Sequence, residues 1–194
     1  MLQQKIIMKF KFSIFLFFLF ISSLHASKWH AEVRAGYFYP TSKTFRNIYE
    51  NGGAEVEGEV AYSFNVNWMI WGNVNYFQRR GRSIGFQDKT TIYMVPISLG
   101  FKYRFQFNRP LLPYLGGGAT YTFLNIKNHS DFVKRNVTKS GFGFVVKAGI
   151  YIYLPRNFYL DPFIDYYYQR VNFHAKRNVD VGGLRIGSGF GYRF

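Results

Sequence analysis

The chain has no cysteine among its 194 residues. Without thiols it can form neither a disulfide nor a cysteine-bound metal site, and it offers no cysteine for attachment of a lipid. Acidic residues are also scarce, with 10 Asp and Glu against 25 Lys and Arg. Because disulfides are what usually compensate for a small core, another framework has to hold this basic protein together.

Long apolar runs are missing too, except near the start of the chain. Residues 12–21 are apolar apart from Ser13, and three lysines precede them. A positive segment followed by a short apolar core is the pattern of a secretion signal peptide. The run has about half of the roughly 20 residues that a spanning helix needs, which disfavours the alternative of a membrane anchor. We expect residues 1–26 to be a signal peptide that is removed, with cleavage after Ala26, and residues 27–194 to form one domain.

What the chain has in abundance is aromatic residues and glycine, with 23 Phe, 16 Tyr and 19 Gly. After the signal no helix-forming run occurs, and apolar residues instead recur at every second position. In segment 54–64, Glu55, Glu57 and Glu59 alternate with Val56 and Val60. Such a period of two places polar and apolar side chains on opposite faces of a β-strand.

Eight segments follow this alternation, at 29–39, 54–64, 68–78, 91–105, 113–123, 140–154, 158–170 and 182–194. The segments at 68–78 and 158–170 fit less well, because Met69, Trp71, Phe163 and Tyr167 would point toward the polar side. Short connections (65–67, 106–112, 155–157) alternate with long ones (40–53, 79–90, 124–139, 171–181). This asymmetry predicts an all-β, closed antiparallel transmembrane β-barrel of eight strands, with short periplasmic turns and longer outer loops.

Alternation alone does not say which face is inside, and a soluble lipocalin-like barrel would also show it. The polar face carries six acidic and six basic residues: Glu32, Glu55, Glu57, Glu59, Asp161 and Asp165 with Arg34, Lys102, Arg104, Lys147, Arg185 and Arg193. Balanced charges are typical of partners across a confined lumen, where unpaired ions are costly. Aromatic residues gather at both ends of the predicted strands, as at a membrane interface. We therefore place the apolar face outward, against lipid.

The last strand ends in a pattern with a family resemblance. Gly189, Tyr192 and Phe194 form a sequence that resembles the C-terminal signal by which the outer-membrane assembly machinery recognises its barrels. Residues 27–194 as a whole resemble the superfamily of small outer-membrane barrels that includes OmpA-like transmembrane domains, OmpX and OmpW. The resemblance implies an integral outer-membrane protein of a Gram-negative-type bacterium, in contact with outer-membrane lipids and the barrel-assembly machinery. We expect a monomer.

The lumen charges allow two interpretations. They could form a selectivity filter that passes ions, or a plug of salt bridges in an interior only wide enough for side chains. The plug is favoured, because an eight-stranded barrel is narrow. Pro96 and Pro162 interrupt predicted paired strands, and we expect them to mark bulges.

The remaining positive charge falls mainly in the predicted outer loops. Residues that could bind anions there are Arg79, Arg80, Arg82, Lys134, Arg135, Lys139, Lys176 and Arg177. Guanidinium groups bind phosphates well, so the outer rim suits lipopolysaccharide or anionic host glycans. The alternative is a set of solvated loop charges without a ligand. Nucleic acid is a poor candidate partner for an exported chain.

Catalysis has little support in the sequence. His129, Ser130 and Asp131 are consecutive, and consecutive residues do not converge as base, nucleophile and orienting acid without unusual backbone geometry. No metal-ligand spacing occurs, and the Gly116–Gly118 segment lacks the lysine and helix of a phosphate loop. We expect no enzyme activity, metal or cofactor. A structural or surface-interaction barrel is the first functional hypothesis, a narrow porin-like channel the second, and a lipid A-modifying acyl enzyme the third.

Overall fold

The computed structural model describes residues 28–49, 51–82, 88–107, 111–128, 136–174 and 177–194, so the predicted signal peptide lies outside the described residues. The strands are β1 (Trp29–Pro40), β2 (Gly53–Ser63), β3 (Trp68–Arg82), β4 (Lys89–Arg104), β5 (Leu111–Asn128), β6 (Asn136–Tyr153), β7 (Phe158–His174), β8 (Arg177–Asp180) and β9 (Gly183–Arg193). One helix, α2 (Lys43–Tyr49), and a 3-10 turn, η1 (Pro155–Asn157), complete the described elements. No helix among these residues is long and apolar enough to cross a membrane.

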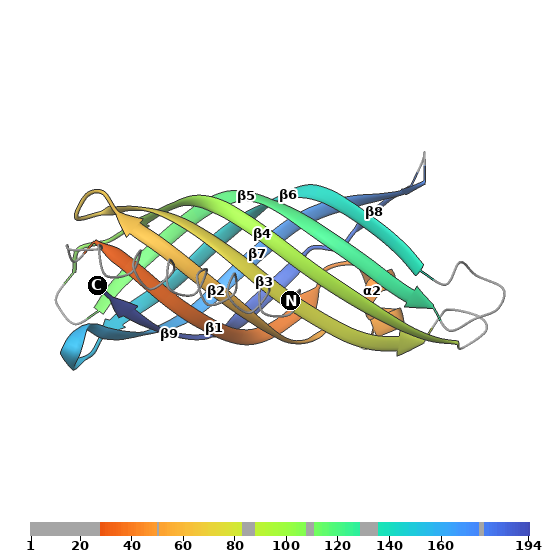
Figure 1. Cartoon of the computed structure of the whole chain (residues 1–194), viewed down its shortest axis with the longest axis horizontal. Helices are drawn as coiled ribbons and strands as arrows, with labels where there is room; N and C mark the ends of the chain where they lie inside the picture. Colours follow the sequence, from red (N-terminus) through yellow and green to blue (C-terminus); the bar gives the residue numbers. More distant parts are fainter. Residues whose placement is uncertain (1–27, 50, 83–87, 108–110, 129–135, 175–176) are drawn as a thin grey trace, which may run out of the picture.

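The sheet is antiparallel throughout and closes on itself (Figure 1). Strand β1 pairs with both β2 and β9, and β6 pairs with β7. β8 continues the line of β9, because β7 pairs with both in one register: Arg170 lies opposite Asp180 and Tyr167 opposite Gly183. Between them the Val181 amide donates to the Gln169 carbonyl oxygen at 3.0 Å. The predicted closed barrel of eight strands is confirmed.

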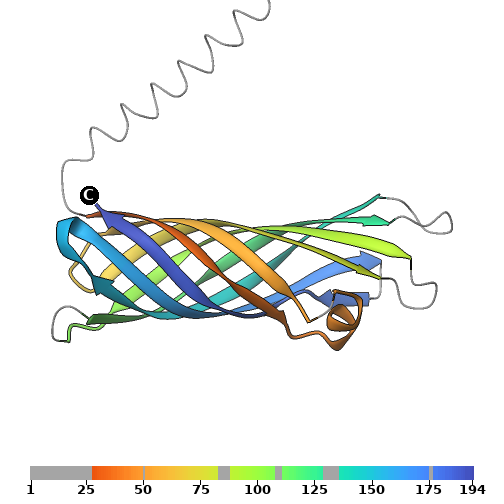
Figure 2. The same cartoon turned by 90° about the horizontal axis from the view of Figure 1, so that it is seen from below.

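The two ends of the barrel differ (Figure 2). One end, here called the terminal end, holds Trp29, Arg193 and the short turns; the other, the loop end, holds α2 and the extended parts of β3 to β8. Strands of 15 to 18 residues in β3 to β7 exceed the roughly 9 to 11 that span a bilayer. Much of the predicted loops 79–90, 124–139 and 171–181 is therefore paired strand. The β3 extension, residues 79–82, is polar on both faces. In β5 the alternation is reversed, because Leu124 is buried and Lys127 is exposed. Neither pattern is that of a strand in lipid, whose apolar residues face outward.

The prediction of bulges at the two prolines was wrong. Pairs on either side of Pro96 in the β3–β4 ladder, Val74–Ile97 and Phe77–Met94, keep one register. The β6–β7 ladder is likewise unshifted across Pro162. A proline only removes one N–H donor, and the neighbouring pairs hold the strands in place without an inserted residue.

The outward face is apolar and the inward face is charged. Val33, Leu99 and Phe142 are 69%, 61% and 75% exposed, whereas the guanidinium-bearing Arg34 on the inward side of β1 is fully buried. This orientation is the reverse of a lipocalin-like barrel, so that alternative is excluded. The inward placement expected for Met69, Trp71, Phe163 and Tyr167 is also observed.

Candidate functional site

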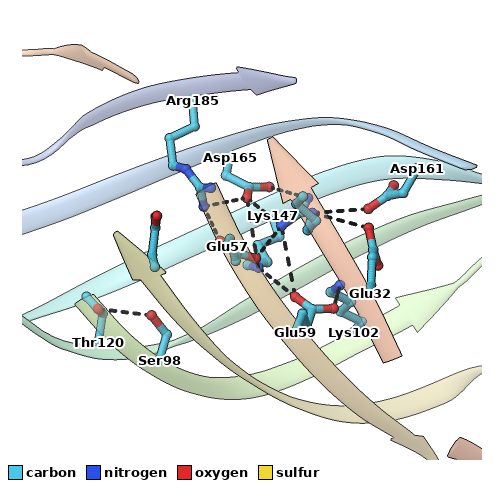
Figure 3. A network of polar contacts seen from close by, with 12 residues as sticks. Glu32, Glu57, Glu59, Ser98, Lys102, Thr120, Lys147, Asp161, Asp165 and Arg185 are labelled. Atoms are coloured by element: carbon cyan, nitrogen blue, oxygen red, sulfur yellow. Dashed lines mark hydrogen bonds and ion pairs between the residues drawn. The ribbon is translucent and has the colours of Figure 1, made fainter. Parts of the chain in front are cut away.

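A network of buried ion pairs fills the middle of the lumen (Figure 3). Arg34 lies at its centre: its Nη1 is 2.9 Å from Glu57 Oε1 and 2.9 Å from Asp165 Oδ2, and its Nη2 donates to Tyr114 Oη at 3.1 Å. Arg34 Nε also faces two carboxylates, those of Glu32 and Asp161. One guanidinium thus ties β1 to β2, β5 and β7 across the lumen.

The other cations of the network link further strands. Lys147 Nζ on β6 donates to Glu57 Oε1 at 2.8 Å and to Glu59 Oε2 at 2.7 Å. Lys102 pairs with Glu59 and donates to Tyr151 Oη at 3.0 Å. Arg185 on β9 pairs with Glu57 and with Glu55, the first of the three β2 glutamates.

The network differs in charge from the balanced set that the sequence suggested. Ten of the twelve expected residues meet, as six carboxylates and four cations, while Arg104 and Arg193 lie apart at the terminal end. Arg104 ends β4 and donates to the Val66 carbonyl oxygen at 2.8 Å in the β2–β3 turn. Strand alternation gives the face on which a side chain lies, but the height along the barrel depends on register.

Two hydrophobic clusters accompany the network. The first lies beyond it toward the loop end and comprises Phe38, Phe45, Tyr49, Phe77, Ile92, Met94, Leu124, Val171 and Val181. The second is interleaved with the ion pairs and comprises Ala61, Met69, Trp71, Tyr114, Val145, Tyr151, Tyr159 and Tyr167. The cavity beside Phe38 and Arg185 measures about 20 Å³, room for about one water molecule.

Helix α2 was not predicted from the sequence, and it contributes Phe45 and Tyr49 to the loop-end cluster. A signal was present: Phe45, Ile48 and Tyr49 have helical spacing, and the Phe45 amide donates to Ser42 Oγ at 3.4 Å. The helix approaches β3 at Gly81, where a Cβ atom would overlap the Ile48 carbonyl oxygen. A run of seven residues inside a long predicted loop was too short to be recognised as a helix.

A basic recess of about 930 Å³ lies at the loop end against β3, β4 and β5. Its cationic lining residues are Arg79, Arg80, Arg82, Lys89 and Lys127. Lys127 Nζ lies 5.2 Å from the centre of the Tyr93 ring, a cation–π distance. Three of the eight predicted anion-binding residues thus come together in what we call the loop-end recess.

The other predicted residues are distributed elsewhere. Lys139 lies on β6 and Arg177 begins β8. Lys134, Arg135 and Lys176 lie outside the described residues, as do His129, Ser130 and Asp131. Within the described ranges no group of His, Asp and Glu could hold a metal ion.

Of the three residues of the predicted assembly signal, Gly189 and Tyr192 lie in β9 and Phe194 directly follows it. The rings of Tyr192 and Phe194 contact each other at a centroid distance of 5.0 Å. Gly189 is buried and lies against the side chains of Glu32 and Arg34. Gly189 therefore also has a packing role inside the barrel.

Comparisons with known proteins agree with this architecture. The family model described as "Outer membrane protein beta-barrel domain" matches residues 13–194. Among solved structures, Neisserial surface protein A is similar with a TM-score of 0.61 and 16% identity, covering 87% of this chain and 98% of that one. Outer membrane protein W of E. coli is similar with a TM-score of 0.55 and 16% identity, covering 88% and 100%. Ail of Yersinia pestis, in complex with the heparin analogue sucrose octasulfate, gives a TM-score of 0.51 and 17% identity, covering 85% and 99%. No curated protein sequence matches significantly.

Proposed function

Because this chain belongs to the outer-membrane β-barrel protein family and is an integral protein of the outer membrane, we propose that it is a surface-interaction barrel that binds phosphate groups of lipopolysaccharide at its loop end. The observation that supports this proposal is the loop-end recess, which five basic residues line. An even number of strands places both termini at the same end of the barrel, and the short turns at that end are typical of the periplasmic side, so the loop end faces outward.

The chemistry of the loop-end recess favours a polyanion. None of the described residues that line it is acidic, and two arginines among them, Arg80 and Arg82, are exposed. Guanidinium groups form forked, charge-assisted hydrogen bonds with phosphate, and arginine keeps its charge at any physiological pH. Lipopolysaccharide presents such phosphates at the outer surface, where these side chains end.

Ail supports the same class of ligand. That barrel was solved with a sulfated heparin analogue, and sulfate resembles phosphate in charge and geometry. At 17% identity the likeness concerns the fold, so the proposal for this chain depends on its own basic residues. Anionic host glycans have the same chemistry and are the second partner class that the loop-end recess would accept.

Charge reversal at the loop-end recess tests the proposal. We expect Arg80→Glu/Arg82→Glu to weaken lipopolysaccharide binding by about tenfold or more, because each basic residue near an anionic lipid surface contributes about 1 kcal/mol and reversal adds repulsion. The measurement is a titration of each folded protein with lipopolysaccharide at two salt concentrations. Screening at the higher salt concentration should reduce the difference in affinity between the variant and wild type.

The matched control makes the same change in charge at the opposite end. Arg156→Glu reverses one exposed basic residue in the η1 turn at the terminal end and should leave lipopolysaccharide binding within about twofold of wild type. The single reversal Arg80→Glu should weaken it by about fivefold. Equal weakening by these two single variants would mean that net charge, and not the loop-end recess, governs binding, which contradicts the proposal.

The channel hypothesis is disfavoured by the contents of the lumen. Ion pairs and two apolar clusters occupy its length, and the cavity at the loop-end side of the network measures about 20 Å³. We expect no stable conductance steps from the folded protein in planar bilayers, and none from Phe45→Ala/Tyr49→Ala, because the charge network still blocks the barrel below α2. Repeated steps from wild type, after a heat-modifiable gel shift has shown folding, would establish the channel instead.

A further inference from the structure

The terminal end of the barrel holds a second recess, separate from the loop-end recess and from the lumen network. It measures about 740 Å³, and three cationic side chains line it: Lys28, Arg104 and Arg193. Its uncharged polar lining includes His30 and Tyr153. Among the described lining residues there is no Asp or Glu, so the positive charges here lack a carboxylate within the recess. We call it the terminal recess.

Four residues that line the terminal recess each carry a buried nitrogen or oxygen atom without a hydrogen-bond partner in the described part of the chain. They are Arg104 Nε, Arg193 Nε, His30 Nδ1 and the Tyr153 hydroxyl. Arg104 and His30 are only 7% and 2% exposed. A buried polar group without a partner costs about 1–3 kcal/mol, more when charged, so four of them around one recess indicate a site for an acceptor.

These donors are held in place before any ligand arrives. The Arg104 guanidinium donates through Nη2 to the carbonyl oxygens of Val66 at 2.8 Å and Asn65 at 3.3 Å, which leaves its Nε unpaired. The Arg104 amide in turn donates to the Asn67 carbonyl oxygen at 2.7 Å. The β2–β3 turn therefore fixes this arginine against the recess.

Arg193 is held by a ring contact with Tyr153, and His30 is held by Ser63. Arg193 lies over the Tyr153 ring, with its guanidinium carbon 5.3 Å from the ring centre. His30 Nε2 is 3.2 Å from Ser63 Oγ, and when it accepts the serine proton, Nδ1 carries the hydrogen and is a donor. Fixed donors reduce the entropy that binding would otherwise cost.

We propose that the terminal recess is an oxyanion site that binds a phosphate group from the periplasmic side, through Arg104 and Arg193 with His30 and Tyr153 as additional donors. Two guanidinium groups and a lysine match a doubly charged phosphate better than a single carboxylate. The phosphate group could belong to a soluble phosphate compound or to a phospholipid headgroup of the periplasmic leaflet, because the chemistry is shared. This inference is independent of the proposed function at the loop end.

Calorimetric titration with inorganic phosphate, in phospholipid-free detergent at low salt, tests the proposal. Every protein in this experiment carries Arg80→Glu/Arg82→Glu, so that phosphate binding at the loop-end recess does not add to the signal. We expect saturable binding at one site, weakened by about tenfold or more in Arg193→Gln and in Arg104→Gln, since each removes a charge-assisted hydrogen bond of about 1.5–3 kcal/mol. Arg193→Gln leaves the β2–β3 turn intact and is informative even if Arg104→Gln fails to fold.

The control is Arg156→Gln, which removes one exposed positive charge at the same end without touching the terminal recess. It should bind phosphate within about twofold of the parent protein, which carries only Arg80→Glu/Arg82→Glu. A parallel titration with a short-chain phosphatidylglycerol assigns the source: at least tenfold tighter binding than phosphate identifies a headgroup, and equal or weaker binding a soluble phosphate. Absence of saturable binding to both probes, or equal weakening by Arg156→Gln and Arg193→Gln, would overturn the site.

Discussion

Lys147→Met is expected to lower the free energy of unfolding by about 3–5 kcal/mol, the usual cost of removing one partner from a buried ion pair. The ammonium group of Lys147 is fully buried and serves two carboxylates, those of Glu57 and Glu59. Its loss would leave six buried carboxylates with three cations. Equilibrium unfolding in urea, followed by tryptophan fluorescence of the protein in lipid vesicles, measures the change.

The control uses the same substitution on the same strand. Lys139 lies in the loop-end part of β6, outside the network. The Lys139→Met substitution should change the free energy of unfolding by less than about 0.5 kcal/mol. In a double-mutant cycle, Lys147→Met with Glu59→Gln should show a coupling energy of at least about 1 kcal/mol, because the two residues are in contact. If the free energy of unfolding of the Lys147→Met variant is within about 1 kcal/mol of the wild-type value, the network does not depend on this pairing.

Gly189→Val should be at least as damaging, lowering the free energy of unfolding by more than about 3 kcal/mol or preventing folding. A Cβ atom at Gly189 would overlap Glu32 Oε1 and lie 2.9 Å from Arg34 Cγ. Relief requires moving Arg34, which binds four other side chains of the network. Urea unfolding measures the lower free energy of unfolding, and loss of the heat-modifiable gel shift shows that the variant does not fold.

Gly58→Val is the matched control, because Gly58 also lies in a barrel strand but on the lipid-facing side. A Cβ atom there has no heavy atom within 4 Å. We expect this variant to fold as wild type does, with a free energy of unfolding within about 0.5 kcal/mol of the wild-type value. Similar damage from both substitutions would mean that glycine matters for strand formation at these positions and not for room in the lumen.

Much of the barrel could be predicted because strand alternation is a local property. Glu55, Glu57 and Glu59 reveal the inward face of β2 from its own sequence, and the apolar residues between them reveal the lipid face. The same signal fails for the extended ends of β3 to β7, because the end of β3 is polar and β5 and β7 carry Leu124 and Val171 on the inward face. It also fails for α2, whose Phe45 and Tyr49 become recognisable as core residues only once the barrel mouth exists to receive them.

The candidate sites were less predictable than the fold. The sequence grouped Arg104 and Arg193 with the lumen charges, because they share the inward face of their strands. In the structure they lie near the turns and line the terminal recess with Lys28. Conversely, Lys89 and Lys127 join Arg80 and Arg82 at the loop-end recess only because β3, β4 and β5 extend together beyond the membrane.

By itself, the sequence determined the class of the protein: eight strands, an apolar outside, a charged inside and alternating short and long connections. Those properties follow from side chains that alternate along each strand, which needs no knowledge of distant residues. The tertiary structure decided which charges meet. Arg34 reaches Asp165, 131 positions away, because closure of the barrel and the register of each ladder set the heights of both side chains. Register and closure are properties of the whole sheet, so only the folded barrel separates the lumen network from the two basic recesses.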